Sequence, residues 1–199
     1  METIIGIGII ILVAIIWAII SGINKSKTSA EHEEIYKKIL IEKGLQPDQI
    51  LFTAHNDSQN CLSINEIKKK LSLGYVDNNQ FVTKEYDFND VISFELQVDD
   101  KSQRKVSIGG AIVGAALAGG LGALIGSQSG KQNVKVRNMH LLITVNSISH
   151  PLIKFSILNP SADGKGWNSD GFMVQNAIQR AEIWTGIFNV ILKQKEKEK

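Results

Sequence analysis

The feature that most constrains this chain of 199 residues is an uncharged apolar run near its start. No side chain from Ile4 to Ile20 carries a charge, and ten of these residues are isoleucine. Backbone amides in hydrocarbon must pair within their own segment, which favours a helix. A helix from Thr3 to Ile23 covers roughly 31 Å, close to the thickness of a bilayer core. The run predicts a transmembrane anchor over residues 1–24, represented by Ile4, Ile11, Trp17 and Ile20.

The residues that flank this run predict its orientation. Only Glu2 is charged before it, and residues 21–23 form a poor cleavage site, so an uncleaved anchor is favoured over a signal peptide. Basic residues follow the run, beginning with Lys25 and Lys27. The positive-inside rule then places the N-terminus outside and the main domain in the cytoplasm, at the cell membrane. A single cysteine, Cys61, agrees with a reducing compartment.

A short juxtamembrane helix and linker are predicted over residues 25–47. Thr28 and Glu31 fit a capping box, and Gly44 is a natural stop. The apolar stripe of this helix consists of Ile35, Ile39 and Leu40. This stripe either docks on the following domain or forms a helix–helix contact.

The period of the apolar residues changes from helical to alternating after residue 48. Short alternating segments separated by turn residues predict half-buried antiparallel strands. These segments lie at residues 50–53, 61–64, 71–73, 87–99, 139–145 and 152–157. Apolar residues at threes and fours from Val174 to Ile191 predict a C-terminal amphipathic helix. We expect one domain over residues 48–194, followed by a charged tail over residues 195–199.

A segment rich in glycine and alanine interrupts this predicted sheet. Val106–Gly130 contains no charged residue. Small residues recur in it every four positions, at Gly110, Gly114, Ala118, Gly122 and Gly126. On a helix they leave one face almost without side chains, where backbones approach closely. The pattern predicts a glycine zipper over residues 106–130, as a re-entrant hairpin, buried in an oligomer or flat on the membrane interface; an apolar loop is the simpler alternative.

Basic residues bracket the predicted zipper on both sides. They are Lys101, Arg104, Lys105, Lys131, Lys135 and Arg137. Pairing of the flanking strands in one sheet would keep both flanks on one side of the membrane. There these side chains would contact anionic headgroups, at about 1 kcal/mol each. Ordinary surface charge on a sheet explains them equally well.

The polar residues do not form a recognisable catalytic or metal-binding motif. The four histidines are scattered without metal-ligand spacing, and there is no pair of cysteines. Gly126–Gln132 departs from a phosphate loop, because three residues separate its glycines and Gln132 replaces the hydroxyl that Mg²⁺ needs. We therefore expect no enzyme activity, no cofactor and no metal. A net charge of +2 gives no general case for nucleic acid.

The strand segment 86–96, the insert 109–126, the strand 139–145 and the terminal helix together resemble a known family. It comprises bacterial and prophage proteins that carry a PH-like domain interrupted by a glycine-rich apolar insert. The likeness covers about Leu51–Leu158 and implies no catalytic residues. The expected fold class is α+β: an N-terminal transmembrane helix, then a PH-like antiparallel β-sandwich or barrel with a C-terminal amphipathic helix and a Gly/Ala-rich helical insert.

Three functions fit these features. The first is a non-enzymatic, membrane-anchored binding or sensing module at the inner face of the membrane, used in phage superinfection exclusion or an envelope response. The second is a self-assembling pore or membrane-disrupting effector built on the glycine zipper. The third is a membrane adaptor for a cytoplasmic protein. The expected partners are membrane lipid, further copies of the chain through the Gly/Ala face, and an unknown protein.

Overall fold

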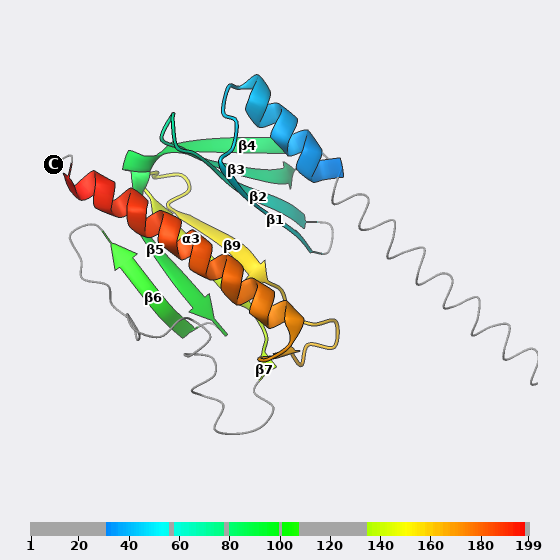
Figure 1. Cartoon of the computed structure of the whole chain (residues 1–199). Helices are drawn as coiled ribbons and strands as arrows, with labels where there is room; N and C mark the ends of the chain where they lie inside the picture. The colour runs from blue at the N-terminus through cyan, green and yellow to red at the C-terminus, as the bar shows by residue number, and fades with distance from the viewer. Residues whose placement is uncertain (1–30, 56–57, 78–79, 100, 108–134, 198–199) are drawn as a thin grey trace, which may run out of the picture.

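Two antiparallel sheets and a long C-terminal helix form the body of this computed structural model (Figure 1). The structure describes residues 31–55, 58–77, 80–99, 101–107 and 135–197. In these ranges no helix is long and apolar enough to cross a membrane. The long helix α3 (Phe172–Lys197) carries polar residues such as Arg180 and Glu182 opposite its buried face, which suits it to a water-exposed surface.

The predicted fold class is therefore corrected. The structure supports an α+β fold of antiparallel sheets with a C-terminal helix. It contains no membrane-spanning helix among the described residues, so the transmembrane helix in the predicted fold class was wrong there. Residues 1–24, to which we assigned that helix, lie outside this part, as does most of the predicted zipper. The predicted domain limits stay predictions.

The first sheet is a meander of four strands in the order β1-β2-β3-β4. The strands are β1 (Gln49–His55), β2 (Ser58–Asn65), β3 (Lys70–Asp77) and β4 (Gln80–Asp87). Side chains alternate between its two faces. Leu62 and Ile64 lie in the main core, whereas Cys61 belongs to a separate cluster on the opposite face. Both faces of this sheet are thus partly buried.

The second sheet has the order β6-β5-β8-β9 and follows a short 3-10 helix, η1 (Phe88–Asp90). Its strands are β5 (Val91–Val98), β6 (Lys101–Ser107), β8 (Met139–Val145) and β9 (Leu152–Leu158). The two-residue strands β7 (Lys135–Val136) and β10 (Trp167–Asn168) pair beside it. Every second residue of β8 is buried, from Met139 to Val145, which confirms the alternation expected there.

Helix α3 covers the core side of the second sheet, where it packs against β5, β9 and η1. The predicted C-terminal helix is confirmed, and its apolar stripe from Val174 to Ile191 is buried. The rings of Phe94 and Phe188 stack with their centroids 5.5 Å apart, and Trp184 packs beside Phe188. Apolar burial of this extent is the main force that holds a helix on a sheet.

The strands on the two sides of the predicted zipper do belong to one sheet. β6 and β8 both pair antiparallel with β5, so they run parallel to each other. Ser107 at the end of β6 pairs with Ser93, whereas Met139 at the start of β8 pairs with Val98. The chain therefore leaves the sheet at one end of β5 and returns at the other, about 17 Å away along the strand.

Candidate functional site

The outer face of the first sheet is covered by a helix over residues 31–42, drawn in blue in Figure 1. The buried cluster beneath it consists of Tyr36, Leu40, Leu45 and Cys61, with Ile50, Phe52 and Phe81 packed against it. The helix therefore docks on the domain, which was one of the two alternatives left open by the sequence. The predicted stripe was wrong in part, because Ile35 is 44% exposed whereas Tyr36 is fully buried.

This helix stops where the sequence predicted, at Gly44. Gly44 has a φ of +67°, in the left-handed region that glycine adopts without strain. Its N–H donates to the carbonyl oxygen of Ile41, and the N–H of Leu45 donates to that of Leu40. These two bonds form a Schellman motif, and the buried pair Leu40 and Leu45 supplies its usual apolar contact.

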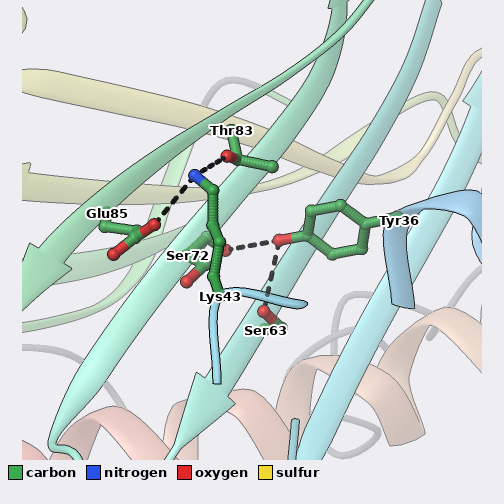
Figure 2. Close-up of polar contacts among 6 residues, drawn as sticks. All are labelled: Tyr36, Lys43, Ser63, Ser72, Thr83 and Glu85. Atoms are coloured by element: carbon green, nitrogen blue, oxygen red, sulfur yellow. Dashed lines mark hydrogen bonds and ion pairs between the residues drawn. The ribbon is translucent and has the colours of Figure 1, made fainter. Parts of the chain in front are cut away.

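Tyr36 joins the helix to the sheet. Its hydroxyl donates to the Ser72 carbonyl oxygen over 3.1 Å and shares a 3.2 Å hydrogen bond with Ser63 Oγ (Figure 2). Its ring lies on Gly74, where an added Cβ would sit only 2.2 Å from a ring carbon of Tyr36. Burial raises the pKa of Tyr36 above its usual value, so the phenol stays neutral. We call this contact of Tyr36 with Ser63, Ser72 and Gly74 the tyrosine junction.

A second polar contact ties the end of the helix to the edge strand β4. Lys43 Nζ donates to Thr83 Oγ1 over 2.6 Å and lies 3.0 Å from Glu85 Oε1 (Figure 2). The Lys43 side chain is 42% exposed. Because water screens such a pair, it contributes less than the buried tyrosine junction.

Cys61 lies beneath the helix and is fully buried. Burial raises the pKa of its thiol, and the negative charge of Glu33 raises it further. A thiol of this kind is a poor nucleophile, because the thiolate is the reactive form. Cys61 therefore acts as a small apolar side chain, and its shielding depends on the docked helix.

A groove runs beside the same helix, between strand β1 and helix α3. It encloses about 290 Å³ and is lined by Glu33, the β1 residues Gln49, Ile50, Leu51 and Phe52, and the α3 residues Arg180, Ile183 and Trp184. No pattern in the sequence predicted this groove. Its two walls lie far apart in the chain, and no local spacing within β1 or α3 indicates that they meet.

Comparison with known proteins matches residues 49–159 to a family model described as a glycine zipper containing PH domain. This chain belongs to that family of glycine-zipper PH domains. The match begins at the first residue of β1 and ends one residue after β9, so the expected resemblance is confirmed. The helix over residues 31–42 and α3 both lie outside it.

Two relatives cover most of the chain. The protein named "Immunity protein" of Bacillus phage SPbeta is 30% identical, over 88% of this chain and 87% of the relative. The "SPbeta prophage-derived uncharacterized membrane protein YomJ" of Bacillus subtilis (strain 168) is also 30% identical, over 88% of this chain and 77% of its own length. No solved structure gives a significant match.

The structure places only some of the residues singled out in this glycine-zipper PH domain. The predicted anchor residues, the five zipper residues and Lys131 lie outside the described ranges. Lys101 pairs with Val98 at the start of β6, and the Asp99 carboxylate accepts hydrogen bonds from the backbone N–H groups of Arg137 and Asn138. The backbones of Lys101 and Arg137 thus share one end of the second sheet.

The remaining headgroup candidates are spread along that sheet. Arg104 and Lys105 pair with Leu96 and Glu95, further along β6, and Lys135 is exposed on β7. Their contact with lipid stays a prediction. Among the described residues no group of three or more histidine, cysteine, aspartate or glutamate side chains is placed to hold a metal ion.

Proposed function

We propose that this protein is a non-enzymatic binding module that acts at the inner face of a bacterial membrane and protects its host against superinfecting phage. The observation that carries this proposal is the similarity to the phage SPbeta protein named "Immunity protein". That similarity extends over 88% of this chain, so it includes more than the glycine-zipper PH domain at residues 49–159.

The membrane location is supported by the second relative, whose printed name describes a prophage-derived membrane protein. It is also supported by composition, because Ile4–Ile20 and Val106–Gly130 contain no charged side chain. Apolar segments of this length favour hydrocarbon over water. The binding role is supported by the groove beside β1, which combines apolar walls with a few charged groups, as docking sites in proteins commonly do.

The proposal is tested by expressing the full chain in a Bacillus subtilis strain that lacks the SPbeta prophage. We expect plating of SPbeta-like phages to fall by at least about tenfold, with normal adsorption of the phage to the cells. Cell fractionation should recover the protein with membranes. Unchanged plating of every phage tested, with the protein present in the membrane fraction, would contradict the immunity role.

A pair of glycine substitutions shows whether protection against phage needs the docked helix over residues 31–42. Gly74→Leu places a side chain against the buried ring of Tyr36, whereas a Cβ at Gly186 meets no atom within 4 Å. We expect Gly74→Leu to abolish protection and Gly186→Ala to retain it at equal protein level. Recovery of the wild-type chain entirely in the soluble fraction would contradict the membrane location, whatever the plating result.

A further inference from the structure

Strand β1 differs from the other three edge strands of the two sheets. Natural proteins discourage unwanted pairing at sheet edges with charged side chains. Strand β4 contains Lys84 and Glu85, β6 contains three basic residues and β9 contains Lys154. Strand β1 has the sequence QILFTAH, without lysine, arginine, aspartate or glutamate. This edge lacks the usual protection.

The backbone of β1 has hydrogen-bonding capacity to spare. All seven of its residues pair with β2 on one side. In an antiparallel ladder, alternate residues direct their N–H and C=O groups to the opposite side. Within the described part of the chain, no other strand or loop backbone hydrogen-bonds to that side. The edge can therefore accept one further strand.

Helix α3 provides an apolar wall next to this edge. Ile183 is 52% exposed although it faces the groove, and Trp184 extends from the groove into the core. A strand added to β1 would present every second side chain to this wall. Main-chain hydrogen bonds on one side and apolar contacts on the other are the two components of recognition by strand addition.

The charges in the groove select the chemistry of the added strand. Glu33 is already paired with Lys37, whose Nζ lies 2.7 Å from Glu33 Oε1. Arg180 is exposed on α3, and no ion pair joins it to another residue in the described ranges. Its guanidinium group therefore favours a carboxylate on the bound segment, since it presents a planar fork of donors that matches one.

We propose that the groove between β1 and α3 binds an extended segment of a protein partner as an additional strand on β1. The segment carries apolar side chains at alternate positions, packed on Ile183, and an acidic side chain that pairs with Arg180. This inference goes beyond the proposed function and does not depend on it, because it rests on the edge strand, the helix wall and the charges alone.

The test uses the full chain and a capped seven-residue peptide with threonine at the odd positions, valine at the second and sixth and glutamate at the fourth, so that valine and glutamate lie on one face. Backbone amide exchange, read by mass spectrometry or NMR, reports on residues 49–55. We expect the peptide to slow exchange in β1 by at least about fivefold and to leave β4 unchanged. A peptide N-methylated at alternate amides, which cannot complete the ladder, should lose this effect.

Substitutions in the protein test the side-chain contacts. Replacing glutamate by glutamine in the peptide should weaken binding about threefold to the wild-type chain, but not to Arg180→Gln. Ile183→Asp should weaken binding of both peptides. Gln179→Glu is the matched control, because Gln179 is an exposed α3 residue outside the groove; it should bind as the wild type does.

Two results would overturn the proposal. One is the absence of protection in β1 at millimolar peptide, or equal protection by the N-methylated peptide. The other is protection of β1 that rises with protein concentration when no peptide is present, which would make a second copy of the chain the occupant.

Discussion

The two α-helices in the described part of the chain cover two sheets by different physical means. Helix α3 buries nine residues along 26, and Phe188 and Trp184 pack within a core shared by both sheets. The helix over residues 31–42 buries chiefly Tyr36 and Leu40, and its position depends on one ring that fits over one glycine. The first contact is broad and redundant, whereas the second is concentrated at a single point.

This difference in buried contacts determines which helix detaches first. Segments held by few buried contacts unfold locally at a lower free energy than the whole domain. The short helix should therefore detach while the sheets and α3 stay folded. Cys61, which lies beneath that helix, is a built-in reporter, because a thiol reagent reaches it only after detachment.

The largest effect is expected from Phe188→Ala. Loss of a fully buried phenylalanine should reduce the free energy of unfolding by about 3–5 kcal/mol, because a cavity remains in the main core. Denaturant unfolding followed by circular dichroism measures it. Val190→Ala, on an α3 residue that is 53% exposed, is the control and should cost less than about 1 kcal/mol. A similar loss in both variants would contradict the central role of α3.

Gly74→Ala should act on the short helix alone. The new methyl group overlaps the ring of Tyr36, and such overpacking costs about 1–3 kcal/mol. We expect alkylation of Cys61 to become at least about fivefold faster under native conditions, with a cooperative unfolding transition retained. Gly186→Ala controls for the change of residue type. Unchanged alkylation would show that the tyrosine junction does not hold the helix.

High pH should loosen the same contact. The pKa of Tyr36 is raised in the folded state, so its contribution is fully present below its ordinary pKa near 10 and is lost as the pH rises further. The loss amounts to about 1.4 kcal/mol for each pH unit above 10. Over this pH range the helix content of the wild type should fall, and tryptic cleavage after Lys38 should become faster. A titration of Tyr36 at its ordinary pKa near 10 would refute the burial effect.

Tyr36→Phe separates the hydroxyl from the ring. The ring still covers Gly74, but the hydrogen bonds to Ser63 and Ser72 are lost, at about 1 kcal/mol. Alkylation of Cys61 should become a few times faster, and the alkaline loosening should be reduced to the contribution of the Cys61 thiol, whose pKa burial also raises. If the helix of this variant loosens above pH 10 as much as that of the wild type, the Tyr36 hydroxyl is not responsible.

The smallest effect is expected from Lys43→Met. The Lys43 contacts with Thr83 and Glu85 are partly exposed, so their loss should cost about 0.5 kcal/mol, and less at high salt. Cys61 alkylation in low and high salt measures this difference. An effect as large as that of Gly74→Ala would place the main attachment at the end of the helix instead of at Tyr36.

Periodicity predicted those parts of the fold in which many residues repeat the same signal. The stripe of α3 and the alternation of β8 were readable in this way, and the helix stop at Gly44 was readable from the residue type alone. Tyr36 was not, because a tyrosine with a buried hydroxyl gains its place from Gly74, a residue 38 positions later whose only contribution is the absence of a side chain. Shape complementarity of this kind leaves no period in the sequence.

The other features that the sequence did not predict correctly have separate causes. Strands β4 and β6 carry several charged residues at sheet edges, so their sequences lack the apolar alternation that identified β8. The groove beside β1 depends on α3, which lies more than a hundred residues away in the chain. The transmembrane helix in the predicted fold class came from hydropathy alone, which does not report how the rest of the chain packs.

The crossover from β6 to β8 has a consequence for the order in which the protein is built on the ribosome. The first sheet is a chain of hairpins between neighbours in sequence, so it can assemble as soon as β4 has been synthesised. The pairing of β5 with β8 must wait until residues 108–134 have been added, and α3 emerges later still. Because β5 and β8 lie further apart in the sequence than any two paired strands of the first sheet, we expect their contact to form more slowly.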